Sequence, residues 1–505
     1  MKYRIIYITF ILLTLLSASV SAQDLWQAYT VNSIGPVGYG LDNSIAVDFS
    51  GGVHIAFCDY PSGALKYAKY SSGKFDIYTA DNSGDVCAYA SIAVDSSGSI
   101  HISHYDMDNK SLKYSANSTG SWVNVTVDDT SSDVGSSSSI AIDSADNPHI
   151  SYYDKTNAIL KYAAMTSGNW KITNIDTING AEEIYSSIAV DLSGAAHISY
   201  TGGADELYVL KYATNKNDFW EISIPLTSAI YSSYTSIDAD FSGNAHIASS
   251  TLNVLTSNPL TDEPSLLYVT NSGHSEIDLI NDDWTSTFID KSTIDYFKSL
   301  DVDIYGNVHI SYYDSQNQDL KYSSNSSGLW ETTTLVNDGQ YAGIISSLKT
   351  DLSANAHVSF YWGANYDDAG YIVYANNMPK SPIIDIKADG SDEPIEIHSG
   401  DRLNLSLLLN PGVRVGEDFY YAALHFSDAG WESLYLDSDS FKWIDDASYV
   451  ISDFPLFHLP LYSDTFLTFD DLDAGSHYFY FLIHRINGSK VVEEFYDGVE
   501  VTVIE

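Results

Sequence analysis

One sequence pattern recurs seven times along the chain, and it limits the folds that the chain can adopt. In its clearest copy it reads Ser-Ile-Ala-Val-Asp, a Gly-containing turn, His-Ile-Ser-His-Tyr-Asp, Leu-Lys-Tyr and then Gly-Ser-Trp. Successive histidines of the pattern lie 47, 48, 48, 49, 63 and 48 residues apart. A repeat of this length indicates one supersecondary unit whose copies pack on their neighbours.

Each copy predicts four short β-strands, which we name a, b, c and d. The Ser-Ile-Ala-Val-Asp, His-Ile-Ser-Tyr-Tyr and Leu-Lys-Tyr runs and the run after the Trp are all β-prone, and Gly, Asn, Asp and Ser separate them. Four-stranded units of this length are typical of β-propeller blades. The sequence therefore predicts an all-β fold whose main body is a seven-bladed β-propeller.

A strand near the N-terminus is expected to close this propeller. Seven positions carry the aromatic residue that marks strand d: Trp26, Phe75, Trp122, Trp170, Trp220, Trp284 and Trp330. The first of them precedes the first strand a, and none follows the seventh strand c. The N-terminal strand should therefore pair with the last triplet as its outer strand, which removes the free sheet edges that an open ring would leave.

The chain divides into three predicted segments. Residues 1–22 predict a signal peptide, because Lys2 and Arg4 precede an apolar run and a small-residue cleavage site. Residues 23–378 hold the propeller. Residues 379–505, where the repeat stops, contain β-prone segments and turn signals and predict an immunoglobulin-like β-sandwich. The expected location is secreted or at the cell surface, and no later stretch is long and apolar enough to predict a membrane span.

The repeat resembles those of secreted bacterial and archaeal β-propeller proteins, which are related to NHL-type and sialidase-like repeats. The resemblance rests on Ser-Ile-Ala-Val-Asp-x-x-Gly-x-x-His-Ile-Ser-Tyr-Tyr-Asp with Leu-Lys-Tyr and Gly-x-Trp, and it covers about residues 25–376. It implies the fold rather than an activity. The C-terminal segment resembles the accessory β-sandwich domains of secreted bacterial proteins.

The charge of the chain restricts its partners. The formal net charge is −44, and removing Lys2 and Arg4 with the signal peptide leaves 21 basic against 67 acidic residues, or −46. Such a charge repels nucleic acid and anionic membranes or polysaccharides. It is compatible with cations, neutral glycans or a solvated acidic surface. The expected partner is a glycan or an extracellular protein, and not nucleic acid.

Cys58 and Cys87 are the only cysteines. Cys58 ends strand b of the first copy, and Cys87 lies in the connection that leads from strand d into the second copy. In a propeller these two connections emerge on the same face, so a disulfide is geometrically reasonable in an exported protein.

Two residue types recur in register in all seven copies, an Asp that ends strand a and a His that opens strand b. A metal site needs ligands that converge on one point, whereas these residues are spread around a ring. We interpret them as a structural device that fixes the turn between the two strands. The pairs are Asp48 and His54, Asp95 and His101, Asp143 and His149, Asp191 and His197, Asp240 and His246, Asp303 and His309, and Asp351 and His357. Asp301, two residues before Asp303, is interpreted as structural as well.

The repeat is broken in the b–c connections of copies 4, 5 and 7, and the candidate ligand-binding residues lie there. Each of these connections carries an acidic pair, and the seventh adds two aromatic residues: Asp205, Glu206, Asp262, Glu263, Trp362, Tyr366, Asp367 and Asp368. Irregular loops on a rigid scaffold often carry function. Carboxylates beside aromatic rings suit Ca²⁺, a neutral sugar or a basic partner. Ca²⁺ is therefore left open as a cofactor, and no metal site is assigned.

These features favour an extracellular binding or adhesion protein that recognises a glycan or a protein through its propeller loops. A polysaccharide-degrading lyase or glycoside hydrolase that uses the same face is the alternative, because carboxylates, Tyr and His can support such chemistry. Sialidase chemistry is disfavoured because it uses clustered Arg to hold a carboxylate. The only arginines are Arg4, Arg402, Arg414 and Arg485, and none lies in the predicted propeller.

Overall fold

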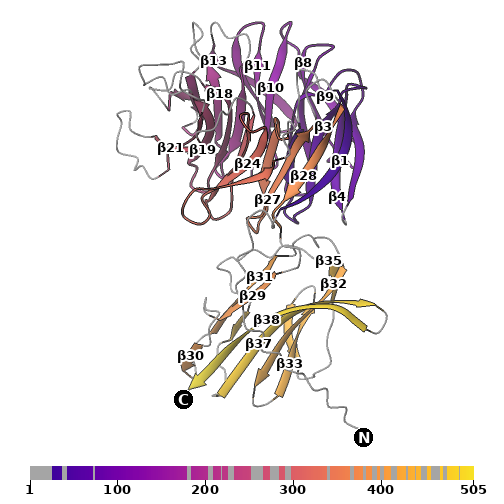
Figure 1. Cartoon of the computed structure of the whole chain (residues 1–505), viewed down its shortest axis with the longest axis vertical. Helices are drawn as coiled ribbons and strands as arrows, with labels where there is room; N and C mark the ends of the chain where they lie inside the picture. The colour runs from indigo at the N-terminus through magenta and orange to yellow at the C-terminus, as the bar shows by residue number, and fades with distance from the viewer. Residues whose placement is uncertain are drawn as a thin grey trace.

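The computed structural model consists of β-strands joined by turns (Figure 1). It describes residues 26–36, 43–71, 74–178, 184–202, 209–217, 219–225, 232–251, 265–272, 284–290, 297–337, 342–363 and 369–378, and beyond these the strands of residues 383–504. Within these ranges no helix is long and apolar enough to cross a membrane.

The described part of the predicted propeller forms seven four-stranded antiparallel sheets, which we number as units. Unit 1 has β2 (Asn43–Val47), β3 (Val53–Asp59), β4 (Ala64–Ser71) and β5 (Lys74–Asp81). Unit 2 has β6 (Ala88–Val94), β7 (Ile100–Asp106), β8 (Ser111–Ala116) and β9 (Val123–Asp128). Unit 3 has β10 (Val134–Ile142), β11 (Pro148–Asp154), β12 (Ile159–Thr166) and β13 (Asn169–Thr177).

The remaining sheets follow the same order of strands. Unit 4 has β14 (Ser186–Val190), β15 (Ala196–Gly202), β16 (Val209–Thr214) and β17 (Glu221–Ser223). Unit 5 has β18 (Ser232–Ala239), β19 (Ala245–Thr251), β20 (Ser265–Thr270) and β21 (Thr285–Asp290). Unit 6 has β22 (Lys298–Val302), β23 (Val308–Asp314), β24 (Asp319–Ser324) and β25 (Glu331–Val336). Unit 7 has β26 (Ser346–Thr350), β27 (Ala356–Trp362) and β28 (Ala369–Asn376), with β1 (Gln27–Pro36) as its fourth strand.

The N-terminal strand lies where the sequence places it, at the outer edge of the last sheet. β1 pairs antiparallel with β28, from Gln27 opposite Asn376 to Pro36 opposite Ala369. The first strand of each unit contacts the first strand of the next unit, and β26 contacts β2. The fold is thus a series of repeated four-stranded sheets packed side by side, as in a β-propeller.

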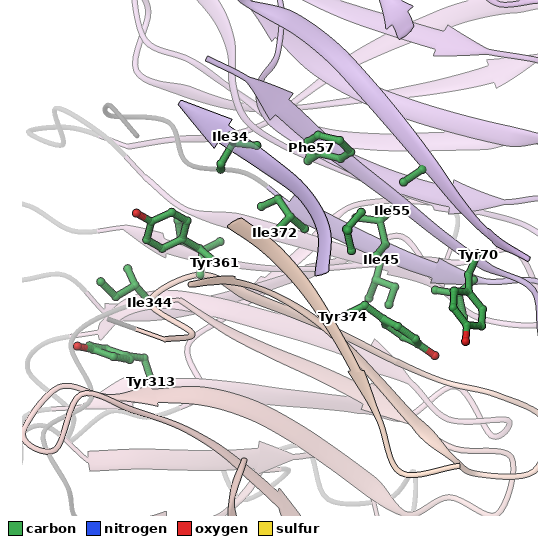
Figure 2. Packing of buried hydrophobic residues seen from close by; sticks show 14 residues of the cluster. Ile34, Ile45, Ile55, Phe57, Tyr70, Tyr313, Ile344, Tyr361, Ile372 and Tyr374 are labelled. Atoms are coloured by element: carbon green, nitrogen blue, oxygen red, sulfur yellow. The ribbon is translucent and has the colours of Figure 1, made fainter. Parts of the chain in front are cut away.

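The apolar cluster between units 7 and 1 shows how the two ends of this series meet (Figure 2). Ile34 of β1 and Ile372 of β28 lie in the same cluster as Ile55 and Phe57 of β3, and all four side chains are buried. Close packing of side chains that lie far apart in the sequence is the main source of stability in such a sheet stack.

The recurring aromatic residue of strand d has one packing role throughout. In every unit it lies beside the strand-c Tyr of the preceding unit, with ring centroids 4.9–5.6 Å apart and interplanar angles of 57–77°. Trp26 packs on Tyr322 of unit 6, and Phe75 packs on Tyr374 of unit 7. Such tilted or edge-to-face geometry is favourable for aromatic rings. The Leu-Lys-Tyr and Gly-x-Trp parts of the repeat therefore join neighbouring sheets.

Residues after Ile383 form a second body in Figure 1 with two sheets. One sheet contains β29 (Ile383–Ala388), β31 (Leu403–Asn410) and β36 (Leu467–Phe469). The other contains β30 (Ile395–His398), β38 (Lys490–Ile504), β37 (Gly475–Asn487), β32 (Asp418–Ser427), β33 (Gly430–Asp437) and β34 (Ser440–Ile444), with β35 (Ser452–Pro455) paired to β32.

A disulfide links the two cysteines, Cys58 at the end of β3 and Cys87 just before β6, with their Cα atoms 5.1 Å apart. The bridge closes a loop with a sequence separation of 29 residues. We expect the purified protein to show no free thiol without reductant. Replacing both cysteines by Ser should lower the free energy of unfolding by about 3.6 kcal/mol, the chain-entropy value for a loop of this length. Titration of two free thiols in the unreduced, unfolded protein would contradict the bridge.

Candidate functional site

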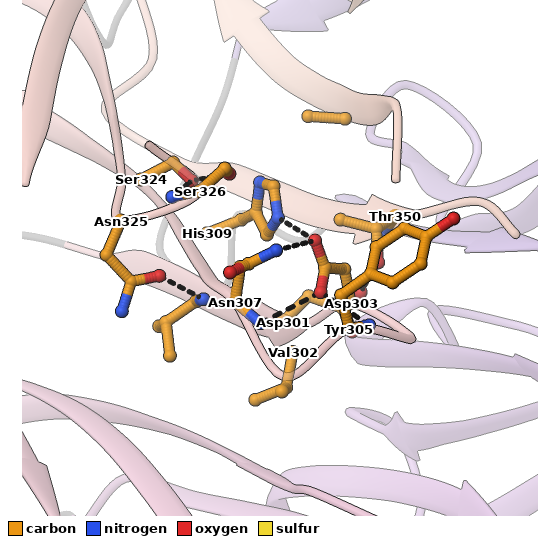
Figure 3. Close-up of polar contacts among 12 residues, drawn as sticks. Asp301, Val302, Asp303, Tyr305, Asn307, His309, Ser324, Asn325, Ser326 and Thr350 are labelled. Carbon is orange, nitrogen blue, oxygen red and sulfur yellow. Dashed lines mark hydrogen bonds and ion pairs between the residues drawn. The ribbon is translucent and has the colours of Figure 1, made fainter. Parts of the chain in front are cut away.

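The recurring Asp and His meet a third recurring residue, the Tyr of strand c. In each unit the His Nε2 lies 3.0–3.3 Å from the Asp carboxylate, and the His Nδ1 lies 2.5–2.7 Å from the Tyr hydroxyl. In unit 6, Asp303 also accepts hydrogen bonds from the backbone N–H groups of Tyr305 and Asn307 (Figure 3). The carboxylate therefore holds the a–b turn, and the histidine joins that turn to strand c.

The electrostatics of this network fit a structural role. Burial alone would raise the pKa of Asp303, but hydrogen bonds from His309 and Asn307 bring it below its usual value. Burial raises the pKa of the strand-c hydroxyl, as at Tyr322, so the Tyr stays protonated. Every polar atom of the Asp and His has a partner within the unit, so the network has no side chain directed at a ligand.

A second repeated contact joins the first strands of neighbouring units. In every unit, the hydroxyl of the strand-a Ser accepts a hydrogen bond from the backbone N–H of the Ile or Leu in strand a of the next unit, at 2.9–3.3 Å. Ser347 of unit 7 accepts from Ile45 of unit 1 at 3.1 Å, so the contact also joins the last unit to the first. We call these residues the serine ring: Ser44, Ser91, Ser139, Ser187, Ser236, Ser299 and Ser347.

The b–c turns and the segments between units lie at the same end of the sheets, which we call the loop face. Val86 donates a backbone hydrogen bond to Gly63 at 2.9 Å, and Ile178 donates one to Ala158 at 2.7 Å. Most of the predicted ligand-binding residues belong to this face by their place in the chain but lie outside the described residues: Asp205, Glu206, Asp262, Glu263, Tyr366, Asp367 and Asp368. Trp362 is described; it ends β27, is half-buried and packs beside Tyr371 with ring centroids 5.9 Å apart.

Three aromatic side chains gather at the loop-face end of the first strands of units 4, 5 and 6. The ring centroids of Tyr185 and Tyr234 are 3.8 Å apart, and those of Tyr234 and Phe297 are 4.2 Å apart. All three rings are half-buried. Lys298 donates from Nζ to the Tyr234 carbonyl at 2.9 Å. We call Tyr185, Tyr234 and Phe297 the aromatic cluster.

The backbone at Tyr234 has a positive φ angle of 44°, and the equivalent positions of units 2 and 3, Tyr89 and Ser137, have φ angles of 52° and 53°. This left-handed conformation accompanies an irregularity in the pairing of strand a with strand b in units 2, 3 and 5, so it belongs to the repeat and not to the aromatic cluster alone. The aromatic cluster lies at the start of strand a, and the b–c connections of units 4 and 5 belong to this same end by their place in the chain. The cluster therefore belongs to the region that the sequence singles out, although the sequence reasoning named none of its members.

A cavity of about 330 Å³ is lined by the first strands of all seven units. Most of the residues along its wall are aliphatic, but polar atoms make up more of the exposed wall than apolar atoms do, and units 5, 6 and 7 contribute Asp238, Asp301 and Lys349, which we call the central trio. Lys349 donates a hydrogen bond to Asp301, whose other oxygen accepts the Thr350 backbone N–H at 2.8 Å and the Thr350 hydroxyl at 2.6 Å. The side chain of Lys349 is 41% exposed, and we attribute that exposure to contact with the cavity that it lines.

Asp238 is the member of the central trio that has no ion-pair partner among the described residues. Its oxygens accept the backbone N–H groups of Ala239 and Val302, each at 2.9 Å. Burial raises the pKa of Asp238 to about 7, and the charge of Asp301 adds to this effect while Lys349 opposes it. Burial would lower the pKa of Lys349, but the two carboxylates raise it, so the amine stays charged.

The sequence does contain a signal for the central trio. The third residue of strand a is Ala in units 1–4, and it is charged in units 5–7. The positions are Ala46, Ala93, Ala141, Ala189, Asp238, Asp301 and Lys349. The structural interpretation of Asp301 covers only part of its role. Asp301 accepts a hydrogen bond from the backbone N–H of Thr350 in the next unit, and it also lines the cavity.

Comparison with known proteins adds structural likenesses only. No family model matches the chain, and no curated protein matches it. The polysaccharide lyase Uly1 is 12% identical over 72% of this chain and 94% of its own, with a TM-score of 0.43. A PL25 ulvan lyase is 12% identical over 68% of this chain and 95% of its own, with a TM-score of 0.44. The Aleuria aurantia lectin is 14% identical over 61% of this chain and 99% of its own, with a TM-score of 0.40. At these TM-scores the likenesses carry no argument about the function of this chain.

Proposed function

We propose that this protein is an extracellular binding protein that recognises a neutral glycan through the loop face of a seven-bladed propeller. The observation that carries the proposal is the aromatic cluster, since half-exposed Tyr and Phe rings offer a rigid, amphipathic contact surface at low conformational cost. The irregular loops of units 4, 5 and 7, which lie outside the described residues, belong to this end by their place in the chain and would supply polar contacts, with Ca²⁺ as a candidate bridging ion.

The remainder of the proposal concerns fold and location. We infer that the seven sheets are blades of one ring closed by β1, because the serine ring and the Tyr–Trp contacts continue from unit 7 into unit 1. Residues 1–22 would be a signal peptide and residues 379–505 an accessory β-sandwich that presents or attaches the propeller. The charge of −44 supports a neutral rather than an anionic glycan.

The proposal is tested on an array of neutral glycans, with and without Ca²⁺, using the mature chain. We expect Tyr185→Ala to weaken the best glycan about tenfold, which corresponds to the loss of one aromatic contact of about 1.4 kcal/mol. Phe49→Ala is the matched control, because Phe49 is 63% exposed but lies in the a–b turn at the opposite end of the sheets. If both variants bind the glycan as tightly as the parent chain does, the glycan does not bind at the loop face.

The same material separates binding from catalysis. A binding protein should retain the glycan unchanged, whereas release of unsaturated or reducing ends would support the polysaccharide-degrading alternative. Replacing Asp205, Asp262 and Asp367 together by Asn tests the acidic loops. If glycan binding by the triple variant still depends on Ca²⁺, the three acidic loops are not part of the site.

A further inference from the structure

The central cavity carries an arrangement of charge that the fold itself does not require. Units 1–4 build the same strand, in the same contact with its neighbours, with Ala at the position where units 5–7 have Asp238, Asp301 and Lys349. Placing charged side chains in such an enclosed layer costs desolvation free energy that Ala would avoid. Three successive departures from Ala at one wall of one cavity therefore point to a ligand.

The charges of the trio do not cancel. Lys349 is hydrogen-bonded to Asp301, and Thr350 satisfies the other oxygen of Asp301. Asp238 is held by two backbone N–H groups, and among the residues that the structure describes no basic side chain forms an ion pair with it. With both carboxyl groups ionised the trio has a charge of −1, and this charge faces the cavity at Asp238.

The cavity is large enough for an organic molecule. Its volume of about 330 Å³ lies at the lower end of the range of small-ligand pockets and far exceeds the space that one water needs. Aliphatic residues of strand a, including Val94, Ile142 and Val190, line it together with polar atoms. The aliphatic part of the lining suits a short hydrocarbon stem, and the carboxylate of Asp238, which has no basic ion-pair partner among the described residues, suits a single positive charge.

We propose that the central cavity binds a small organic cation, a primary ammonium group on an aliphatic stem, with Asp238 as its counter-ion. An ammonium group is compact and has three donors for the free lone pairs of the carboxylate. A divalent metal is a poorer match, because the described residues contain no group of three or more His, Cys, Asp or Glu side chains placed to hold one. This site is independent of the glycan proposal, which concerns the loop face.

A proton competes with the cation for Asp238. The charged groups that line the cavity around it are Asp301, Lys349 and Asp351, and Asp351 is paired with His357 at 3.1 Å. Because the pKa of Asp238 is raised to about 7, this carboxyl group is mostly ionised at pH 8 and mostly protonated at pH 6. Binding of the ammonium ion should therefore be about tenfold weaker at pH 6 than at pH 8.

The experiment is calorimetric titration of the mature chain with n-butylammonium in an amine-free buffer at pH 6 and pH 8. Butan-1-ol is the neutral probe of the same shape, and Ca²⁺ is the inorganic probe. We expect one butylammonium site, the tenfold change with pH, and no binding of the alcohol. Absence of a butylammonium site, equal binding of butan-1-ol, or displacement of butylammonium by equimolar Ca²⁺ would each overturn the proposal.

Variants locate the site. Asp238→Ala introduces the residue that units 1–4 already have at this position, and it should abolish butylammonium binding. Asp129→Ala removes one negative charge from an exposed position and should leave binding unchanged, which controls for attraction by the overall acidic charge. Asp238→Asn is the second test variant, and retained binding in either Asp238 variant that melts cooperatively would place the cation elsewhere.

Discussion

Removal of residues 23–36 should lower the free energy of unfolding by at least about 5 kcal/mol, because β1 contributes several buried or partly buried apolar side chains. Val31 and Ile34 are buried in the cluster between units 7 and 1, and Trp26 packs on Tyr322. Gln27 also donates from Nε2 to the Met378 carbonyl at 3.1 Å. The deletion would expose the edge of β28 and break the contact between the two ends of the sheet series. Calorimetric melting of the truncated and full-length mature chains measures the effect.

Matched single substitutions show whether β1 behaves as an integral strand. Trp26→Ala and Trp330→Ala remove equivalent aromatic residues, since Trp330 packs on Tyr268 as Trp26 packs on Tyr322. Both should cost about 3 kcal/mol, less than the deletion. A deletion mutant that melts within about 2 °C of the full-length chain would mean that β1 does not close the ring.

The fold could be anticipated because every recurring residue has a recurring contact between strands or between units. The strand-c Tyr meets a His on one side and an aromatic ring of the next unit on the other, so it is needed in every copy. The strand-a Ser bonds the next unit in the same way each time. A periodic requirement in space leaves a periodic trace in the sequence, and the strands could be placed from that trace alone.

The candidate sites were harder to anticipate because they depend on residues from different repeats that become neighbours only when the sheets pack side by side. Asp238, Asp301 and Lys349 come from three different repeats, and only the side-by-side packing of the first strands brings them to one cavity. Tyr185, Tyr234 and Phe297 share a position two residues before the strand-a Ser, where unit 2 also has an aromatic residue, Tyr89. Loop length alone directed attention to residues such as Asp205 and Asp262, which lie outside the described residues.

Asp303→Ala should be the most destabilising single substitution among the repeated acidic residues, at about 3 to 5 kcal/mol. The carboxylate is buried and accepts hydrogen bonds from two backbone N–H groups, from the Asn307 amide at 2.9 Å and from His309 at 3.0 Å. Removing it leaves four donors without this acceptor, among them the buried ring of His309, which costs more than the loss of an average hydrogen bond. Chemical denaturation of the variant and the parent at pH 7 measures the difference.

The pH dependence of this difference identifies its cause. The pKa of Asp303 is below its usual value in the folded chain, so its ionised form stabilises the fold above about pH 4, the ordinary range of an Asp carboxyl. This contribution is lost as the pH falls through the folded-state pKa, so the gap between variant and parent should narrow below pH 4. Asp129→Ala, at an exposed position, should change stability by less than about 0.5 kcal/mol at either pH. A gap that stays constant from pH 7 to pH 3 would show that Asp303 acts by packing alone and not as the charged acceptor of the a–b turn.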